Sequence, residues 1–322
     1  MTDLTLAICM YNAEKYIKET LESVIAQTMQ DFYLLIVNDS STDGSITAVE
    51  EFFKQHPRQY ELVTLEKNSG IAQARNFAIS YAKTKYFLFI DSDDLLEPTL
   101  IKKEYTEIIS DRDLIGVSCW NDFIDQKGRK VHGGTFLGEK TKEDFINKSS
   151  HKKLIFLPIH TMFNREYALK AGSICTQGFP EGDPRYQDFC EELDMWTRMS
   201  DFYKEGKAII TIPEVLYHYR KSDGLSSNHF NMIIKMRYTK RNLLLRRSGE
   251  KELTFIEFYN SLSDKELKKL KNDAKAADSL RNGVFYLKRR NIFKGTWEIM
   301  KSIYYRPGYI FDKLRHNFFK KK

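Results

Sequence analysis

The first ninety residues alternate short β-rich apolar runs with amphipathic stretches, and this alternation constrains the fold more than any other feature of the chain. The apolar runs lie at residues 4–10, 33–37, 61–65 and 86–90. The amphipathic stretches lie near residues 14–28, 45–55 and 71–82. Such an order predicts βαβ units that build a parallel sheet. Polar or small residues follow every run, so we expect four polar segments to face one crevice at the carboxyl ends of the strands.

The rest of the chain is less regular. We predict a strand at 114–120, a turn at 126–128, a helix at 189–203 and a strand at 209–212 that ends before Pro213. Beyond residue 228 the pattern is helical and basic. At 322 residues the chain is long enough for a large domain with an extension. We therefore predict an α/β domain at 1–227 and a helical basic region at 228–322.

Composition excludes several protein classes. With 42% hydrophobic and 30% charged residues, the chain is neither disordered nor membrane-spanning, and it has no apolar run of roughly 18 residues. Its four cysteines are scattered without a C-x-x-C pair, which argues against a zinc site or a disulfide framework. The first residues lack a secretory signal pattern. We expect a cytoplasmic protein, and a peripheral position at the inner face of the cell membrane stays open as an alternative.

Carboxylates cluster directly after the fourth apolar run, at Asp91, Asp93 and Asp94. Their mutual repulsion would be relieved by a cation, and hard oxygen ligands suit Mg2+ or Mn2+. The same segment could instead cap a helix, because Asp caps well and helical sequence follows. On this segment alone both interpretations stay open.

Three further segments, taken together with residues 91–94, favour metal binding over helix capping. They are residues 11–14, 38–45 and 68–76, which follow the first three runs in order. In this order and spacing the chain resembles the family 2 glycosyltransferases of GT-A fold, from about residue 4 to residue 227. The resemblance implies an α/β fold with a Rossmann-like mixed sheet flanked by helices. It also implies inverting transfer of a sugar from a nucleotide-sugar donor.

The resemblance assigns donor-binding roles to several side chains near the strand ends. Asp39 matches the carboxylate that contacts the nucleotide base, usually uracil, which favours a UDP-sugar donor. Tyr11 and Glu14 match the positions around the base and ribose, and Arg75 matches a donor-binding arginine. Each has a simpler alternative, since Asp39 could close a turn, Glu14 could favour a helix start and Arg75 could be a surface charge.

The same resemblance divides the acidic segment. Asp91, with Ser92, is expected at the ribose, and Asp93 is expected to hold Mn2+ or Mg2+ against the diphosphate. Residues 213–227 resemble the closing loop of the family, in which Arg220 would reach the pyrophosphate and His218 would lie near the metal. A histidine between two tyrosines is more often simply packed.

A second acidic segment, residues 190–199, is similar to the family motif that carries the catalytic base at a helix start. Alignment places Glu192 at the base position, and Glu191 is the substitute candidate. A general base must reach the acceptor hydroxyl, and a paired acid can raise its pKa toward neutrality. The alternative is an acidic helix start with Met195 and Trp196 packed inward.

The C-terminal segment interleaves aromatic residues with lysines and arginines from residue 288 onward. This composition suits contact with an anionic membrane surface or a partner protein. No nucleic-acid-binding signature accompanies these charges, so we do not expect nucleic acid as a partner. A helical pair that packs its aromatic residues on the core explains the pattern equally well.

Two other functions share parts of this pattern. A sugar-phosphate nucleotidyltransferase shares the nucleotide-binding sheet and the acidic metal site, although the glycine-rich basic start of that class is absent. A non-catalytic nucleotide-sugar-binding subunit would have lost some of the acids. By resemblance, we expect the acceptor to be a glycan, lipid-linked or protein-linked, in bacterial surface-glycan synthesis.

Overall fold

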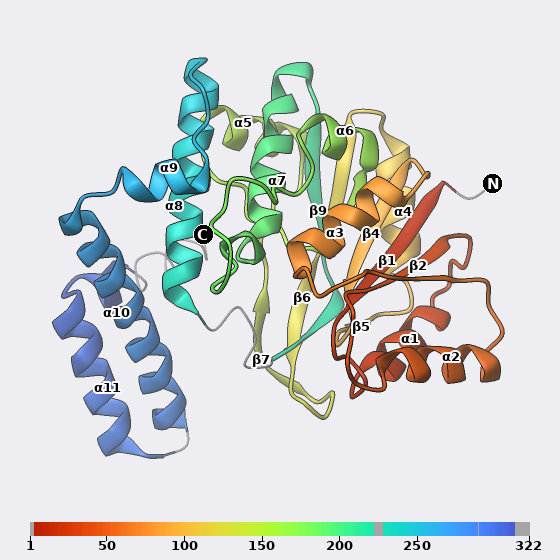
Figure 1. Cartoon of the computed structure of the whole chain (residues 1–322), viewed down its shortest axis with the longest axis horizontal. Coiled ribbons are helices and arrows are strands. Elements are labelled where there is room, and N and C mark those ends of the chain that lie inside the picture. The colour runs from red at the N-terminus through yellow and green to blue at the C-terminus, as the bar shows by residue number, and fades with distance from the viewer. Residues whose placement is uncertain (1–2, 222–227, 289, 313–322) are drawn as a thin grey trace. The chain divides into compact units, whose positions relative to one another are not determined.

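The computed structural model describes residues 3–221, 228–288 and 290–312 (Figure 1). In this part of the chain, nine strands form one mixed sheet in the order β3-β2-β1-β4-β8-β6-β9-β5, with β7 paired to β6. The strands are β1 Leu4–Met10, β2 Tyr33–Asn38, β3 Glu61–Thr64, β4 Tyr86–Asp91, β5 Leu95–Leu96, β6 Leu114–Ile124, β7 Lys130–Thr135, β8 Met162–Asn164 and β9 Ala208–Arg220. The predicted sheet flanked by helices is confirmed.

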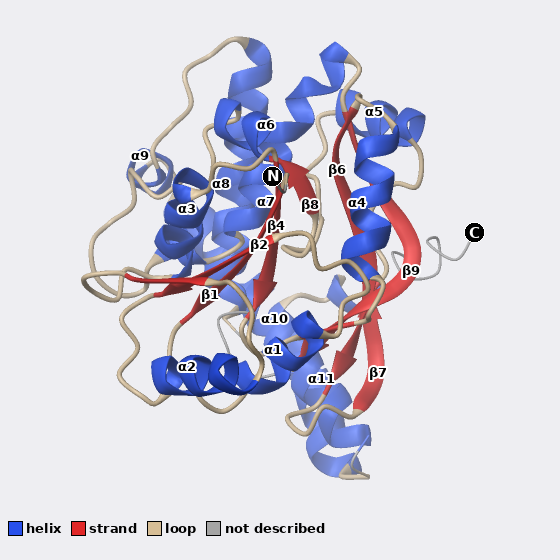
Figure 2. Ribbon diagram, turned by 90° about the vertical axis from the view of Figure 1, so that its right-hand side faces the viewer, coloured by secondary structure: helices blue, strands red, loops and turns tan. Residues whose placement is uncertain are grey.

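Strands β1 to β4 are parallel, and the predicted βαβ order accounts for them. Strand β1 is buried along its whole length and β4 is buried up to Asp91, as expected for parallel strands covered on both faces. Helix α3 lies on one side of β1 and β2, and helices α1 and α2 lie on the other (Figure 2). The helices in this region are α1 Ile17–Ile25, α2 Ser45–Gln55, α3 Ile71–Tyr81, α4 Leu100–Ser110, α5 Lys142–Ser150, α6 Arg165–Lys170 and α7 Glu191–Met199.

The register brings the carboxyl ends of the central strands to one edge. Met10 pairs with Asn38, and Cys9 pairs with Asp91. The polar segments after β1, β2 and β4 therefore begin at the same level of the sheet. The shared edge agrees with the arrangement of strand ends predicted from the sequence.

Strand β9 differs from the prediction. We expected a strand at 209–212 followed by a loop, whereas β9 continues through Pro213 to Arg220 beside β6. Cys119 pairs with Ile212 but Trp120 pairs with Val215, so the register shifts around the proline. A proline lacks the N–H that a ladder needs and is accommodated at such irregularities. The remainder of the expected closing loop, residues 222–227, lies outside the described residues.

The predicted helix at 189–203 is shorter than expected. Helix α7 covers Glu191–Met199, and the 3-10 helix η2 continues over Ser200–Glu205. Cys190 precedes α7 with φ 50°, a left-handed conformation that breaks the helix on its N-terminal side. This break places both glutamates in the first turn of α7.

The chain divides into two compact units whose boundary differs from the predicted cut at 227/228. The first unit contains residues 1–177, 190–222 and 242–251, and the second contains 178–189, 223–241 and 252–322. Residues 242–251 join the first unit because Arg246 and Arg247, near the end of α8 (His229–Ser248), pair with Asp201. Residues 178–189 join the second because Tyr186 stacks on Phe255 with ring centroids 4.6 Å apart.

The second unit is helical, as predicted. Besides the first part of α8 it contains α9 Phe255–Asn260, α10 Asp264–Lys288 and α11 Ile292–Tyr305. Its core is a cluster that includes Ile234, Tyr238, Phe255, Phe258 and Leu270. No helix within the described residues is long and apolar enough to cross a membrane.

Candidate active site

Side chains that the sequence assigned to the donor tie the loop after β2 to the loops after β1 and β3. Asp39 is buried, and its two carboxylate oxygens accept the backbone N–H groups of Ser69 and Gly70, each at 2.8 Å. Glu14 accepts the N–H of Gly44 at 3.0 Å. These bonds fix the loops in place. The base-binding roles of Asp39 and Glu14 stay predictions.

Tyr11 stands out among these residues because nearly half of its surface is exposed. It follows β1 directly, and the next residue, Asn12, has φ 51° and accepts the N–H of Thr42 at 2.8 Å. The backbone around Tyr11 is therefore anchored while its ring remains open to solvent. Such a ring can pack against a nucleotide base, which keeps the predicted role of Tyr11 consistent with its position.

Arg75 occupies the centre of the site. It follows Gly70, whose φ of 91° suits glycine at the start of α3, and its guanidinium is almost fully buried. One terminal nitrogen pairs with Asp91 and the other pairs with Glu191. Burial opposes the charge of Arg75, but the two carboxylates overcome it and raise its pKa above the usual value. Arg75 thus links the end of β4 to the start of α7.

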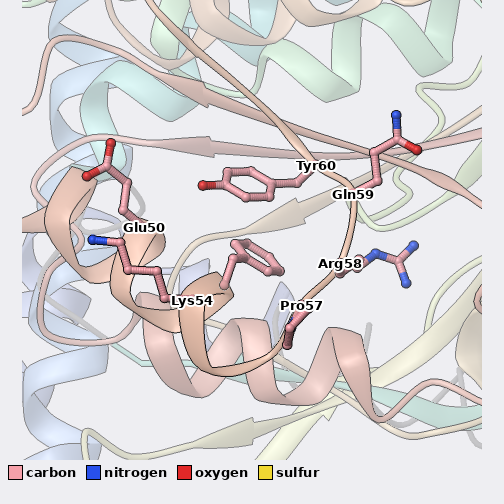
Figure 3. A pocket seen from close by; sticks show the side chains of 7 residues that line it. Glu50, Lys54, Pro57, Arg58, Gln59 and Tyr60 are labelled. Atoms are coloured by element: carbon pink, nitrogen blue, oxygen red, sulfur yellow. The ribbon is translucent and has the colours of Figure 1, made fainter.

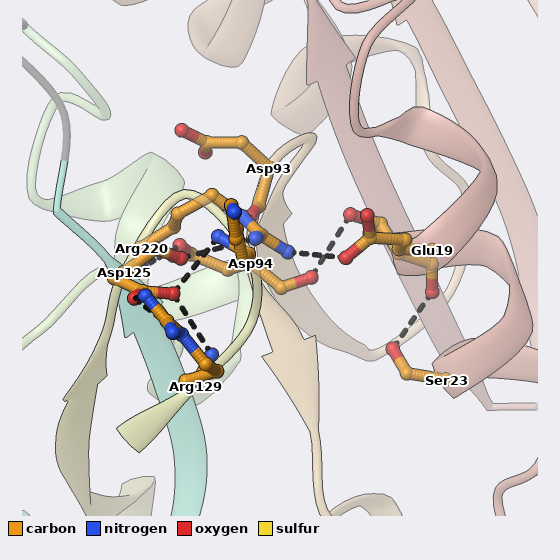
Figure 4. Close-up of polar contacts among 9 residues, drawn as sticks. Glu19, Ser23, Asp93, Asp94, Asp125, Arg129 and Arg220 are labelled. Carbon is orange, nitrogen blue, oxygen red and sulfur yellow. Dashed lines mark hydrogen bonds and ion pairs between the residues drawn. The ribbon is translucent and has the colours of Figure 1, made fainter. Parts of the chain in front are cut away.

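Asp93 is the free carboxylate of the acidic segment. Its side chain has no hydrogen bond or ion pair with any other residue in the described part of the chain, and it points away from the neighbouring polar network (Figure 4). Burial and the nearby Asp91 raise the pKa of Asp93 to about 6. A partly buried carboxylate without a partner fits a divalent cation. No group of three or more potential metal ligands occurs among the described residues, so substrate oxygens would have to complete the coordination.

Asp94 and Arg220 form a structural pair behind Asp93 (Figure 4). Asp94 is buried and accepts the backbone N–H of Arg220 at 2.7 Å. The Arg220 guanidinium is fully buried and donates to the carbonyl of Asp93 at 2.6 Å, to the carbonyl of Asp125 at 3.2 Å and to Glu19 at 2.7 Å. The side chain therefore braces the acidic segment. Its predicted contact with the pyrophosphate would require an exchange of these partners and stays a prediction.

His218 is also engaged by protein groups. Its Nδ1 bonds to Asp122, and its Nε2 lies 2.9 Å from a carboxylate oxygen of Glu97. Both ring nitrogens are therefore occupied. A metal-binding role for His218 stays a prediction that requires the release of one carboxylate.

The contact between Tyr217 and Asp91 was not predicted from the sequence. The Tyr217 side chain is fully buried in β9, and its hydroxyl accepts the backbone N–H of Asp91 at 3.2 Å. The ring stacks on His160 with a centroid distance of 3.8 Å. Tyr217 thus holds the backbone of the acidic segment in place at Asp91. The sequence carried no signal for this contact, because residues 213–220 were predicted as a loop.

The two glutamates of α7 differ in their surroundings. Glu191 is buried and paired with Arg75, whereas Glu192 retains partial exposure. Burial and the adjacent Glu191 raise the pKa of Glu192 to about 8, although Arg75 opposes this shift. Glu192 therefore binds a proton near neutral pH. Neither Asp91 nor Ser92 makes a contact that tests its predicted position at the ribose.

A separate open hollow lies on the surface away from these residues (Figure 3). It is formed by α2 and the segment that leads into β3, and none of the predicted site residues lines it. Its lining residues are Glu50, Phe53, Lys54, Pro57, Arg58, Gln59 and Tyr60. The candidate active site is therefore the strand edge and not this hollow.

Comparison with protein families finds a match to the family described as Glycosyl transferase family 2 over residues 5–172, just over half of the chain. Among curated relatives, the teichoic acid poly(glycerol phosphate) polymerase of Staphylococcus epidermidis is 35% identical over 161 residues. That alignment covers 48% of this chain and 22% of the relative, so the chain spans about a fifth of the relative's length.

Two solved structures share the fold. S. aureus TarS 1-349 in complex with UDP-GlcNAc superimposes with a TM-score of 0.56 at 20% identity, covering 96% of this chain and 92% of that one. The mannosyltransferase PcManGT from Pyrobaculum calidifontis, in complex with GDP-Man and Mn2+, gives a TM-score of 0.52 at 18% identity, covering 97% and 88%. The predicted GT-A fold is confirmed.

Proposed function

Because this chain belongs to glycosyl transferase family 2, we propose that it transfers a sugar from a nucleotide-sugar donor to an acceptor hydroxyl with inversion at the anomeric carbon. The observation that carries the proposal is the pair of glutamates on α7. Glu191 is bound by Arg75, and Glu192 is left beside it with a raised pKa of about 8. A carboxylate that takes up a proton near neutral pH is suited to act as a general base.

In the proposed reaction, the carboxylate of Glu192 removes the proton from the acceptor hydroxyl. The acceptor oxygen forms a bond to the anomeric carbon while the bond between that carbon and the diphosphate oxygen breaks. The nucleoside diphosphate leaves with the electron pair of the broken bond. Glu191 is not the base in this scheme, because its side chain is buried and is already engaged by the Arg75 guanidinium.

We further propose that Asp93 holds Mn2+ or Mg2+. Its carboxylate has no partner and follows the end of β4 closely, and its pKa is raised. A divalent cation there would neutralise negative charge on the diphosphate. The presence of Mn2+ in the PcManGT structure supports this choice. Asp91 is held by Arg75 and by the Tyr217 contact, which fixes the position from which it would reach the ribose.

For the donor, we propose a UDP-sugar. The support is Asp39 at the base-binding position and the UDP-GlcNAc complex of TarS, which shares the fold. For the acceptor, we propose a lipid-linked or protein-linked glycan of a bacterial surface polymer, supported by the relationship to a teichoic acid polymerase. The match to a glycosyltransferase family favours sugar transfer over sugar-phosphate nucleotidyl transfer. The cytoplasmic location expected from the sequence remains a prediction.

A donor panel tests the proposal. The purified chain is incubated with UDP-, GDP- and CDP-linked sugars and Mn2+, and the release of nucleoside diphosphate is recorded with water as the acceptor. We expect release from a UDP-sugar, lost in a Glu192→Gln variant and retained in Glu51→Gln, which alters an exposed glutamate on α2. Release of pyrophosphate, or equal rates for the parent and Glu192→Gln, would overturn the proposal.

A further inference from the structure

Helices α10 and α11 form a hairpin, and small residues occur where the two helices meet. Helices α10 and α11 lie side by side (Figure 1) and contact each other through small residues. A Cβ on Gly283 would lie 3.1 Å from the carbonyl oxygen of Gly295, and Ser302 donates a hydrogen bond to the carbonyl of Ala276 at 2.8 Å. The two glycines therefore let the helices approach closely along one seam, with Ile299 packed against Gly283 and Leu287 packed against Gly295. Other large side chains of α11 lie on its opposite face.

The face of α11 opposite this seam is apolar and open to solvent. Phe293 is 84% exposed, Trp297 56%, Met300 50% and Tyr304 82%. These residues are four, three and four positions apart, so they form one stripe along the helix. We call these four residues the outer stripe. An exposed apolar stripe of this kind indicates a surface that binds a membrane or another molecule.

Cations border the outer stripe on one side. Lys294 and Lys301 are seven positions apart and about a quarter turn from the stripe, so they lie on the same flank of α11. Lys301 pairs with Glu298 on this flank. Arg290, in the turn between the helices, is exposed as well. Near this turn, α10 and α11 expose more apolar side chains, Val284, Leu287 and Ile292. The tip of the hairpin thus combines apolar groups with positive charge.

We propose that the outer stripe and the hairpin tip bind the surface of an anionic lipid bilayer. Helices that lie in the membrane interface have an apolar face rich in Trp, Phe and Leu, and they have Lys or Arg on the polar side. Tryptophan and tyrosine favour the boundary between headgroups and hydrocarbon. Lysine is depleted in protein–protein interfaces, which argues against a second copy of the chain as the occupant.

Vesicle flotation tests the proposal with the full chain. Vesicles of phosphatidylcholine with phosphatidylglycerol should bind the protein, and vesicles of phosphatidylcholine alone should bind it more weakly, as should anionic vesicles in high salt. A Phe293→Ser, Trp297→Ser double variant should lose about tenfold or more in binding, because two large apolar side chains no longer enter the interface. The matched control is Ile109→Ser, a 50% exposed apolar residue on α4.

Fluorescence locates the contact on the helix. The chain has three tryptophans, and Trp196 is fully buried, whereas Trp297 is in the stripe. Brominated lipids should quench Trp297 on binding, and a Trp297→Phe variant should still bind while losing that quenching. Circular dichroism confirms that the variants are folded.

Three results would overturn the proposal. One is equal binding of the parent and the double variant to anionic vesicles. Another is an absence of quenching of Trp297 by brominated lipid. The third is a parent that is dimeric by light scattering and becomes monomeric in the double variant without any lipid binding, which would assign the outer stripe to a second copy of the chain.

Discussion

Replacement of Glu192 by glutamine separates the proposed catalytic role of this residue from any role in folding. At pH 7 the Glu192 carboxyl is mostly protonated in the folded chain, because its pKa is raised from 4.5 to about 8. In the unfolded chain the same group is ionised at pH 7. The folded state therefore bears a penalty for holding a proton that solvent would remove.

The size of this penalty follows from the pKa shift. About 2.5 pH units separate the ordinary pKa of 4.5 from pH 7, and each unit is worth 1.36 kcal/mol, which gives at most roughly 3 kcal/mol. A group with a raised folded pKa contributes its stability below the unfolded pKa and loses it as pH rises toward the folded pKa. The parent should thus lose stability between about pH 4.5 and pH 8 relative to Glu192→Gln. At pH 7 the variant should be more stable by up to this amount.

Activity should change in the opposite direction. Loss of a general base lowers kcat by about 100-fold to 10,000-fold. Urea unfolding from pH 4.5 to 8 and steady-state kinetics on the same preparations measure both effects. Glu191→Gln is the matched comparison, because it removes one of two anionic partners of the buried Arg75 and should destabilise the fold by on the order of 3 kcal/mol. If Glu192→Gln unfolds the chain while Glu191→Gln leaves stability intact and abolishes transfer, the two roles are reversed.

Three further substitutions probe the acidic segment. Asp93→Asn should reduce transfer by about a hundredfold or more across a Mn2+ titration, since it removes the unpaired carboxylate, and near-parental rates would refute its role. Arg220→Met should lower the free energy of unfolding by about 3 kcal/mol, because two backbone carbonyls and Glu19 lose their buried donor, and urea denaturation measures this loss. Tyr217→Phe should destabilise the chain by about 1 kcal/mol and lower kcat more than it raises KM, since the N–H of Asp91 loses its acceptor. A change in KM alone would contradict a positioning role for Tyr217.

The parallel half of the sheet was predictable because each of its strands obeys a local rule. Strands β1, β2 and β4 are buried on both faces and read as continuous apolar runs, and the polar segments at their ends follow from the topology. The helix at Ser45–Gln55 was predicted with its bounds because its amphipathic pattern is complete. These features need no information from distant residues.

The contacts of β9 were not predictable in the same way. Its pairing with β6 passes Pro213 only because the register shifts there, and a sequence pattern does not reveal such a shift. For this reason Arg220 was predicted to reach the pyrophosphate of the donor. In the structure its guanidinium is fully buried against carbonyls from two distant segments. The pairing of Arg75 with Glu191, 116 positions away, is likewise a product of the tertiary fold.

The engagement of both arginines bears on how the site would receive a diphosphate. Arg75 is neutralised by Asp91 and Glu191, and Arg220 is turned toward Glu19 and backbone carbonyls. The two cations that the sequence assigned to the donor are therefore already balanced by protein groups, while Asp93 adds an unpaired carboxylate at the same edge. A diphosphate entering there would meet repulsion unless positive charge came with it. The charge balance of the folded chain, and not only the resemblance of its motif, is thus the physical reason to expect a divalent cation at Asp93.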